Sequence, residues 1–390
     1  MITIQQEDLN TTLGAVTRAS LKNSLMAAFS LVRLDARVDG QIMLSCFNGE
    51  TAARAITNAA CEEDLSVCVD AATLRAIVET LTGEIHMLIE GNSLVLESTC
   101  NRTTLRIVDE ELPIIGDENG RTLAVLPGTT FHSLSRILPF ASTDEARLIL
   151  QVVHLIFDQD EVTAMTADGY SAGIVQKCVE GVAGRTSVSL PLGFARLLVS
   201  LMDEGDRVSV QTSGENRYLF QIRNDDRNKH MTVATVTSAE NFPAEQIQTL
   251  TDEARQNTIA TLNVQQVSLA QTIRMVNAMN AQSAFIKATG GVVKMASAET
   301  ETGQARNILE GTASGEDASL WVSAVYLKRA AEGSRGELTV RISGAQKPML
   351  VEAGGFTAII MPILADGHKD PFPEEEALAI NLPEMNAVPA

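Results

Sequence analysis

The residue types that most often carry chemistry are scattered in this sequence. Its five cysteines form no CxxC pair and its five histidines form no HExxH motif, so neither set has metal-ligand spacing. No GxxxxGK[ST] stretch occurs. Acidic pairs such as Asp144-Glu145 and Asp203-Glu204 fall where a loop or helix end is expected, which favours solvated charge. The sequence predicts no catalytic residue, no metal site and no cofactor.

The cysteines and the first residues indicate a reducing compartment. Unpaired cysteines of an intracellular protein are expected to be small buried apolar side chains. The N-terminus, MITIQQEDLN, is polar and acidic and resembles no signal or transit peptide. No apolar run approaches the roughly 20 residues that cross a bilayer. We therefore expect a cytoplasmic protein with buried thiols at Cys46, Cys61, Cys68, Cys100 and Cys178.

Charge gives two opposite indications. The net charge of −19 argues against nucleic acid, because affinity for phosphates grows with the number that Lys and Arg neutralise. Yet arginines and lysines recur within the expected helices, while most acids of those helices lie at their ends. A modestly basic helical face on an acidic body fits this pattern. Since charged residues on a solvated helix face are common, the pattern alone decides nothing.

One strand–helix–strand pattern that could position those basic residues occurs three times. Each copy begins with Ser and an alternating apolar run, changes to helical spacing, and reaches a glycine after 17 or 18 residues. In the third copy we expect Val325, Tyr326 and Ala330 on the buried helix face. The copies span residues 66–89, 187–210 and 319–340, with the glycines at Gly83, Gly205 and Gly336.

A second helical unit repeats in step with the first. An apolar lead-in and a helix with the same spacing start at Ile4, at Leu126 and at Val264, and the middle helix is expected over residues 129–140. Copies more than a hundred residues apart indicate repeated domains rather than a solenoid. We predict an α+β fold of three similar domains, each with two helices packed on antiparallel sheets. Their bounds are 1–120, 121–248 and 249–364, followed by a proline- and glutamate-rich tail, 365–390, expected to be disordered.

The middle domain carries motifs that resemble those of the bacterial sliding clamps, the β subunits of DNA polymerase III. Residues 139–175 are similar to the clamp pattern A-S-x-D-E-x-R, a hairpin, then T-A-T-D-G-[HY]-R-L-A. Phe242-Pro243 and residues 359–362 match two further signatures, and the similarity covers residues 1–364. The resemblance implies a head-to-tail homodimer whose six domains form a ring around duplex DNA, without enzymatic activity, as a processivity factor in the cytoplasm on the nucleoid.

In such a ring the two helices of each domain line the hole. Enclosure makes tight phosphate binding unnecessary, so weak attraction inside and an acidic exterior suit sliding. The resemblance then makes the following residues DNA-facing: Arg18, Lys22, Arg75, Arg136, Arg196, Arg274, Lys328 and Arg329. It places Leu105 and Ile107 on one side of the dimer contact and Ala278 and Met279 on the other.

The resemblance also implies a surface pocket between domains two and three. It would take short peptide motifs from the polymerase III α subunit, the clamp loader δ subunit and repair proteins. Carried over position by position, the pocket residues are Leu150, Ala167, Gly169, Ala172, Pro243, Ile247, Ile359, Met361 and Pro362.

Several positions depart from the family pattern. Family members usually carry Thr at position 167, Arg at 171 and Leu at 172, whereas this chain has Ala167, Ser171 and Ala172. We expect a wider, shallower pocket with altered peptide preference. The tyrosines that the family pattern implies for DNA contact near the 139–150 loop are absent, and Leu148 and Ile149 lie in that neighbourhood instead. The tail either competes for the pocket through residues 378–382 or acts as a disordered spacer, which we favour.

Two alternatives remain. One is an enzyme built on repeated α+β domains, which lacks any nucleophile–base pair or phosphate loop in this sequence. The other is a divergent, mobile-element type of clamp-like protein that encircles DNA but serves different partners. The altered pocket gives the second alternative some force.

Overall fold

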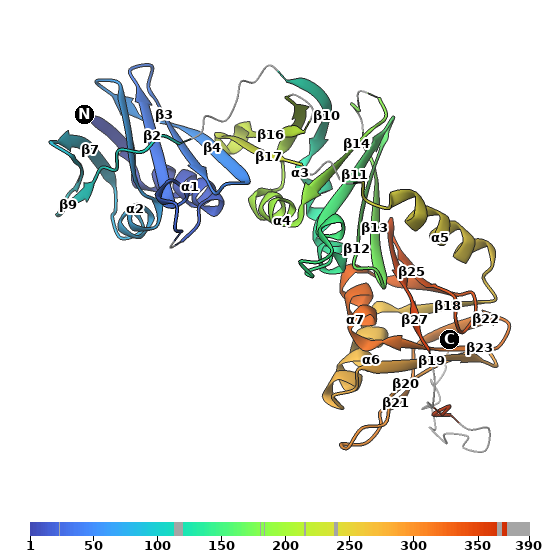
Figure 1. Cartoon of the computed structure of the whole chain (residues 1–390). Coiled ribbons are helices and arrows are strands. Elements are labelled where there is room, and N and C mark those ends of the chain that lie inside the picture. Colours follow the sequence, from blue (N-terminus) through green and yellow to red (C-terminus); the bar gives the residue numbers. More distant parts are fainter. Residues whose placement is uncertain are drawn as a thin grey trace, which may run out of the picture. The chain divides into compact units, whose positions relative to one another are not determined.

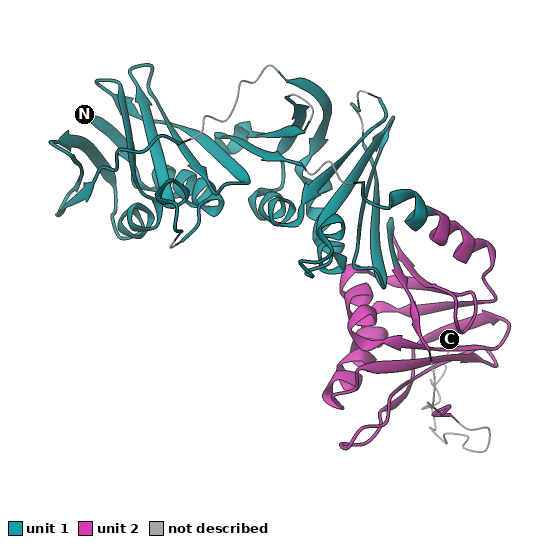
Figure 2. Ribbon diagram, in the orientation of Figure 1, with its two compact units in different colours: residues 1–248, 355–358 teal, residues 249–354, 359–390 magenta. Residues whose placement is uncertain are grey.

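The computed structural model describes residues 1–22, 24–112, 120–179, 181–182, 184–213, 216–237, 241–364 and 369–372. These form two compact units (Figure 2). Unit 1 comprises Met1–Gln248 with Gly355–Ala358, and unit 2 comprises Thr249–Gly354 with Ile359–Ala390. Both units are α+β with antiparallel sheets, as predicted.

The repeated strand–helix–strand pattern is confirmed in all three copies. In every copy the glycine before the second strand has a left-handed backbone, with φ of 74° at Gly83, 87° at Gly205 and 72° at Gly336. Glycine adopts this conformation without the steric cost that a Cβ brings. The copies are β6 (Leu65–Asp70), α2 (Ala71–Val78) and β7 (Glu84–Glu90); β14 (Thr186–Pro191), α4 (Leu192–Leu201) and β15 (Arg207–Thr212); and β23 (Ala318–Ser323), α7 (Ala324–Gly333) and β24 (Glu337–Ile342).

An eight-stranded sheet runs through unit 1 and joins the first two predicted domains. Its order is β10-β15-β16-β17-β4-β3-β2-β6. The junction is the antiparallel ladder between β17 and β4, in which His230 pairs with Ile56 and Thr235 with Thr51. The strands not yet bounded are β10 (Arg121–Pro127), β16 (Arg217–Asn224), β17 (Lys229–Val236), β4 (Thr51–Asn58), β3 (Gln41–Phe47) and β2 (Leu31–Arg37).

Helix α1 (Gln6–Val16) covers one face of this sheet. It packs on β3 and β4 and lies beside α2 (Figure 1). Its Leu9, Leu13 and Val16 are buried, which is the apolar spacing of a helix with one face on a core. Glu7 and Asp8 occupy its first turn, where the helix dipole favours negative charge.

Two further sheets complete unit 1. One has the order β5-β1-β7-β8-β9 and leaves β9 at an edge. In the other sheet, the strands of unit 1 have the order β14-β11-β12-β13. The amide of Gln176 on β13 donates to the carbonyl of Gly355 (2.8 Å). The bounds are β5 (Ala60–Cys61), β1 (Ile2–Gln5), β8 (Ser93–Ser98), β9 (Asn101–Arg106), β11 (Val152–Asp158), β12 (Glu161–Ala167) and β13 (Ser171–Cys178).

Unit 2 has the same kind of construction. One part contains β25 (Met349–Ala353), β24, β18 (Ala260–Gln265) and β22 (Gly311–Gly315), in that order. A five-stranded sheet has the order β21-β20-β19-β23-β27, from β21 (Arg306–Ile308), β20 (Val292–Ser297), β19 (Ser283–Thr289), β23 and β27 (Pro362–Ile363). Helices α6 (Gln266–Ala278) and α7 lie side by side (Figure 1).

The single middle helix predicted over residues 129–140 is wrong. The segment consists of α3 (Gly128–His132) followed by two 3-10 turns, η3 (Ser133–Arg136) and η4 (Leu138–Phe140). Ser133 and Ser135 donate their hydroxyls to the carbonyls of Thr129 and His132. Such back-bonding competes with helical hydrogen bonds, and Pro139 has no amide proton to donate.

The structure differs from the sequence analysis at two further helices. Helix α5 (Ala244–Gln256) was not predicted, although Ile247 and Ala254 are buried at helical spacing. In α7 the core face holds Ala324, Leu327 and Ala330, and Val325 is exposed. Strand β11 begins at Val152, directly after the 3-10 turn η5 (Leu148–Leu150) and Gln151.

The structure describes one short stretch of the tail, residues 369–372. Residues 369–372 pack against unit 2, and Phe372 is 6% exposed. Disorder was therefore the wrong prediction for these four residues. Residues 365–368 and 373–390, including the segment 378–382 suggested as a competitor, lie outside the described residues.

The cysteine prediction holds in part. Cys46 and Cys68 are buried free thiols, and burial raises the pKa of Cys46 above its usual value. Cys61 is half-buried, whereas Cys100 and Cys178 are exposed, so burial was the wrong prediction for those two. Among the helices of the described residues, none has the length and apolar character that crossing a membrane requires.

Candidate nucleic-acid and peptide interfaces

A repeated hydrogen bond holds the paired helices of the first and third copies. Gln6 begins α1, and its Nε2 donates to the carbonyl of Val78 at the end of α2 (2.9 Å). Gln266 begins α6, and its Nε2 donates to the carbonyl of Ala331 in the last turn of α7 (3.0 Å). The backbone amides of the two glutamines donate to the carbonyls of Gly83 and Gly336. Each glutamine thus satisfies a carbonyl that a helix end leaves without an intrahelical partner.

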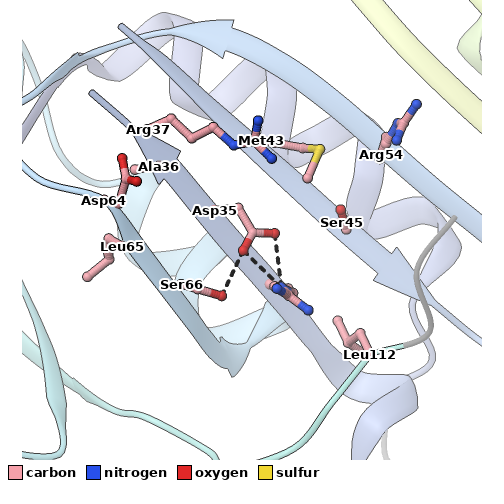
Figure 3. A pocket seen from close by; sticks show the side chains of 11 residues that line it. Asp35, Ala36, Arg37, Met43, Ser45, Arg54, Asp64, Leu65, Ser66 and Leu112 are labelled. Atoms are coloured by element: carbon pink, nitrogen blue, oxygen red, sulfur yellow. Dashed lines mark hydrogen bonds and ion pairs between the residues drawn. The ribbon is translucent and has the colours of Figure 1, made fainter. Parts of the chain in front are cut away.

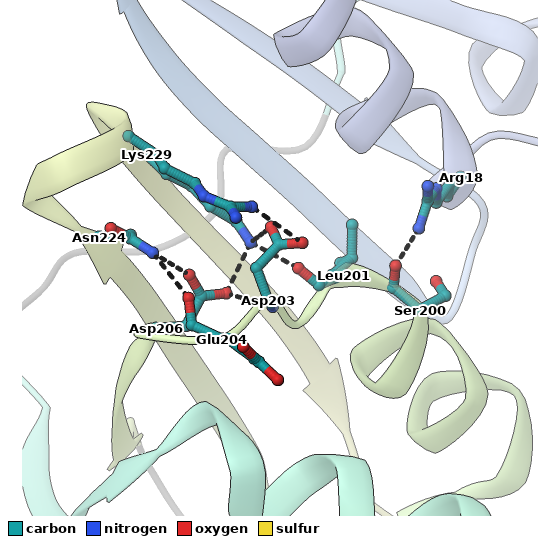
Figure 4. A network of polar contacts seen from close by, with 9 residues as sticks. Arg18, Ser200, Leu201, Asp203, Glu204, Asp206, Asn224 and Lys229 are labelled. Atoms are coloured by element: carbon teal, nitrogen blue, oxygen red, sulfur yellow. Dashed lines mark hydrogen bonds and ion pairs between the residues drawn. The ribbon is translucent and has the colours of Figure 1, made fainter.

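In the middle copy, a charged side chain satisfies the carbonyl at the helix end. Gly128 begins α3, so no glutamine is available, and Lys229 from β17 donates instead to the carbonyl of Leu201 (2.6 Å). Lys229 also bonds Asp203 (2.8 Å) and Asp206 (2.6 Å), and Asn224 donates to Asp206 (2.9 Å; Figure 4). The hydrogen bond from Lys229 holds the pKa of Asp203 below its usual value.

Arg18, predicted to face DNA, has a structural partner. It lies in the 3-10 turn after α1 and donates from Nη1 to the carbonyl of Ser200 in the last turn of α4 (Figure 4). A cation at a helix C-terminus interacts favourably with the helix dipole. A cavity of about 470 Å³ surrounds this contact, and Arg75, Arg227 and His230 also line it.

The other DNA-facing candidates of unit 1 differ in their surroundings. Arg196 on α4 and Lys22 are exposed. Arg75 on α2 forms an ion pair with Glu79 (2.8 Å) and lies 3.5 Å from the hydroxyl of Thr17. Arg136 is half-buried, with its guanidinium 4.9 Å from the centroid of the Phe356 ring.

In unit 2 the three candidates lie on α6 and α7. Arg274 is exposed on α6. On α7, Lys328 pairs with Glu332 (3.8 Å), and the guanidinium of Arg329 lies 5.2 Å from the Tyr326 ring. The helices of both units therefore carry exposed basic residues, as the sequence predicted, while their role stays a prediction.

Four predicted pocket residues converge within unit 1. Ala167 on β12 pairs with Ala172 on β13, and the amide of Ser142 donates to the carbonyls of both Leu150 and Ala167. A Cβ on Gly169 would lie 3.9 Å from a methyl of Leu150. The predicted residues Leu150, Ala167, Gly169 and Ala172 are thus neighbours.

Arg147 belongs to this cluster and was not predicted. Its Nη1 donates to the carbonyl of Asp168 (3.0 Å), and its guanidinium lies 5.6 Å from the Tyr170 ring. A Cβ on Gly169 would be only 2.6 Å from Nη1, so Gly169 leaves the space that Arg147 occupies. The sequence did contain a signal for it, because Arg147 is the arginine that ends the A-S-x-D-E-x-R motif.

The segment before α5 carries two more predicted pocket residues. Pro243 accepts a hydrogen bond from the amide of Ile247 (3.2 Å), and Ile247 is 6% exposed. Phe242 stacks on His154 of β11 with 5.3 Å between ring centroids, and burial lowers the pKa of His154. Ile359, Met361 and Pro362 belong to unit 2, so one pocket formed by all nine predicted residues stays a prediction.

The predicted dimer residues lie at element ends and edges. Leu105 is on the edge strand β9, and the amide of Ile107 donates to Asn92 (3.0 Å). Ala278 ends α6 and is exposed, and the carbonyl of Met279 accepts hydrogen bonds from Thr300 and Thr302. An edge strand has unpaired backbone groups that can pair with another chain.

A different cavity lies on the solvent face of the eight-stranded sheet. It has a volume of about 480 Å³, and Arg33, Arg37 and Arg54 line it (Figure 3). Asp35 accepts hydrogen bonds from Arg33 (3.0 Å) and Ser66 (2.7 Å). None of the residues predicted for DNA or peptide binding lines it. The part of the chain that the structure describes contains no cluster of three His, Cys, Asp or Glu residues that could hold a metal ion.

Comparison with known structures identifies the fold. No protein-family model matches the chain, and no curated protein matches its sequence. A DNA polymerase sliding clamp from Bacillus subtilis is similar in structure, with a TM-score of 0.84 and 17% identity over 93% of this chain and 98% of that one. A DNA polymerase III β chain from Streptococcus pneumoniae gives 0.83 and 20% identity, over 93% and 99%.

The chain therefore has the fold of the DNA polymerase sliding clamps. More narrowly, it is the fold of the bacterial polymerase III β subunit, as a Thermotoga maritima β subunit also indicates (TM-score 0.81, 16% identity, 93% and 99% coverage). The resemblance seen in the sequence motifs is confirmed at the level of the fold.

Proposed function

We propose that this protein is a DNA sliding clamp. Two copies associate head to tail through β9 with Leu105 and Ile107 on one side, and Ala278 with Met279 on the other. The closed ring encloses duplex DNA and confers processivity on a replicative polymerase. In this arrangement the helix faces that carry Arg196 and Arg274 point toward the DNA.

The observation that carries this proposal is the match of nearly the whole chain to clamp structures. It extends over 93% of this chain and 98% of the Bacillus subtilis clamp. The helices supply a few exposed cations on a chain of net charge −19. Sparse cations attract phosphates weakly and without sequence preference, which permits sliding.

Partner recruitment would use the cluster of Leu150, Ala167, Gly169 and Ala172. Small side chains at positions 167 and 172 leave room for a large aliphatic or aromatic anchor of a partner peptide. Candidate partners are the polymerase α subunit, the clamp loader δ subunit and repair proteins. Calorimetry should show that an ordinary clamp-binding peptide binds this protein more weakly than it binds a clamp with Thr, Arg and Leu at positions 167, 171 and 172. Equal affinity for the two proteins would contradict this prediction.

A second candidate function is a divergent clamp that encircles DNA for different partners. The buried Ser171 supports it, since its hydroxyl donates to Asp168 (3.2 Å) instead of presenting a cation to a peptide. Pull-down with a replicative polymerase distinguishes the two functions. Capture of the polymerase supports the replicative role. A protein that stays on circular DNA but does not capture the polymerase supports the divergent clamp.

The test of encirclement is topological. The protein is loaded on nicked circular DNA, and the DNA is then cut once. A ring should remain on the circle in high salt and leave after linearisation, whereas a phosphate-binding protein would leave both forms alike in high salt. Native mass measurement should give a dimer, and a stable monomer would overturn the proposal.

A further inference from the structure

The described tail residues dock on unit 2 in a defined position. Phe372 and Pro371 are buried, and Phe372 joins a cluster with Phe285, Ala296 and Trp321. The Phe372 ring centroid lies 6.5 Å from that of Phe285, which in turn lies 5.0 Å from the Trp321 ring. A segment without regular secondary structure thus adds an aromatic ring to a sheet surface.

The strand register explains this surface. Ala296, Phe285, Trp321 and Ile363 are direct cross-strand partners across β20, β19, β23 and β27. Directly paired residues share a face of a sheet, so the four form one apolar row. Two residues further along the strands, Lys287 pairs with Lys294 on the same face.

The opposite face of this sheet already has its own core. Ala284, Ile286 and Val322 alternate with the apolar row and are 4% exposed or less. The helix side of unit 2 therefore does not require Phe372. Without the tail, the row would be an apolar strip beside two ammonium groups.

The docked segment matches that strip group by group. Lys287 Nζ donates to Oδ2 of Asp370 (2.6 Å) and to the carbonyl of Phe372 (3.2 Å). Lys294 Nζ lies 5.7 Å from the centroid of the Phe372 ring, within cation–π range. Asp370 Oδ1 accepts the amide of Phe372 (2.8 Å), a local turn that Asp and Pro favour.

We propose that this surface is a peptide-binding groove for Asp-Pro-Phe, filled in cis by residues 370–372. The groove is defined by Phe285, Lys287, Lys294, Ala296 and Trp321. Only residues 365–368 separate Leu364 from Lys369, and so short a tether gives an effective concentration in the ~mM range. A partner protein with an exposed Asp-Pro-Phe segment must displace the tail to bind. This inference does not rest on the clamp function.

The chain offers its own probe, because Trp321 is its only tryptophan and is 5% exposed. In the full chain with Phe372→Ala, the emission maximum of Trp321 should move to longer wavelength. A ten-residue peptide with the sequence of 367–376, GHKDPFPEEE, should reverse the shift saturably. The same peptide with Ala in place of Phe should not. Lys369→Ala, at an exposed neighbouring position, should leave the emission unchanged.

Two comparisons test specificity and cis occupancy. The wild-type chain should bind the peptide at least tenfold more weakly than Phe372→Ala, because its groove is filled. Adding Lys287→Met to Phe372→Ala should weaken peptide binding about tenfold, as loss of hydrogen bonds from a charged donor does. Failure of the peptide to bind Phe372→Ala at millimolar concentration, or equal binding by the wild type, overturns the proposal.

A second variant covers the case in which Phe372→Ala unfolds the chain, which circular dichroism would reveal. Asp370→Lys keeps the ring but places a cation against Lys287, at a side chain 42% exposed. It should undock the tail, shift the Trp321 emission and allow the peptide to bind in trans. Unchanged emission with no peptide binding would contradict the groove.

Discussion

The carboxylate of Asp206 lies 2.6 Å from Nζ of Lys229, and the Asp206 side chain is fully shielded from solvent. Lys229 also donates to the carbonyl of Leu201 at the end of α4. The middle copy therefore holds its second helix with a buried ion pair, where the other two copies use a glutamine. This difference gives the copies different sensitivities to mutation and pH.

Lys229→Met should lower the free energy of unfolding by about 3 kcal/mol, because breaking a buried pair leaves a buried charge without its counter-ion. Denaturant unfolding measures this. Arg227→Met is the matched control, since Arg227 contacts Asp203 (3.4 Å) from a side chain 59% exposed, and such pairs contribute less than about 1 kcal/mol. Equal losses in the two variants would contradict the buried-pair interpretation.

The terminal glutamines can be tested with their own neighbours as controls. Gln6→Ala and Gln266→Ala should each cost about 1 kcal/mol, since each removes a hydrogen bond to a helix-end carbonyl. Gln5→Ala and Gln265→Ala change exposed side chains that form no capping bond and should be nearly neutral. Thermal unfolding of the four variants measures these losses. Equal losses of stability for Gln6→Ala and Gln5→Ala, or for Gln266→Ala and Gln265→Ala, would rule out capping by that glutamine.

His154 should make unit 1 sensitive to mild acid. Burial lowers its pKa in the folded state, so the unfolded chain binds the proton first as the pH falls. Stability present above the unfolded pKa of about 6.5 is then lost as the pH falls toward the folded pKa. Unfolding measured from pH 7.5 to 5 should show a decline that His154→Phe flattens, while stacking on Phe242 is kept. If stability declines equally with falling pH in His154→Phe and in the wild type, groups other than His154 cause the decline.

Gly169→Ala should destabilise unit 1 by about 1–2 kcal/mol, because φ is +95° there and a left-handed backbone strains other residues. The new methyl would also meet Arg147 Nη1. In an Arg147→Ala background the penalty should shrink without vanishing, because the backbone strain remains. Denaturant unfolding in a double-mutant cycle measures this coupling, and full additivity would show that Arg147 does not fill the space beside Gly169.

The exposed arginines should contribute to DNA binding in proportion to phosphate contacts. Arg196→Ala and Arg274→Ala should each lower the slope of log affinity against log salt by about 0.9 on short duplexes. Arg37→Ala, on the solvent face of the sheet, should leave the slope unchanged. Arg18→Ala should lower the free energy of unfolding and change the salt slope little, because its guanidinium is bonded to the carbonyl of Ser200. Fluorescence anisotropy across a salt series measures the slopes.

Much of the fold could be predicted from spacing alone. The change from period 2 to helical period and the three glycines located β6–α2–β7 and its two copies. The middle helix was mispredicted because Ser133 and Ser135 bond back to the chain. Helix α5 escaped notice because it lies between two repeats, where no second copy reinforced the pattern.

The candidate sites were predictable only in part. Motif comparison found Leu150, Ala167, Gly169 and Ala172, which local packing brings together. Spacing could not reveal that Arg18 is bonded to Ser200, since the two are 182 residues apart. Phe372 was missed for a related reason: a single aromatic residue in a polar tail has no periodicity, and only the register of β19, β20 and β23 creates its partner surface.

The ladder between β4 and β17 has a mechanical consequence. Its paired residues run from His230–Ile56 to Thr235–Thr51, so pulling the two halves of unit 1 apart along the strands would load the rungs in shear, all at once. Such a seam resists force far better than one that unzips rung by rung. We therefore expect the two halves of unit 1 to stay joined along this seam when the proposed ring opens.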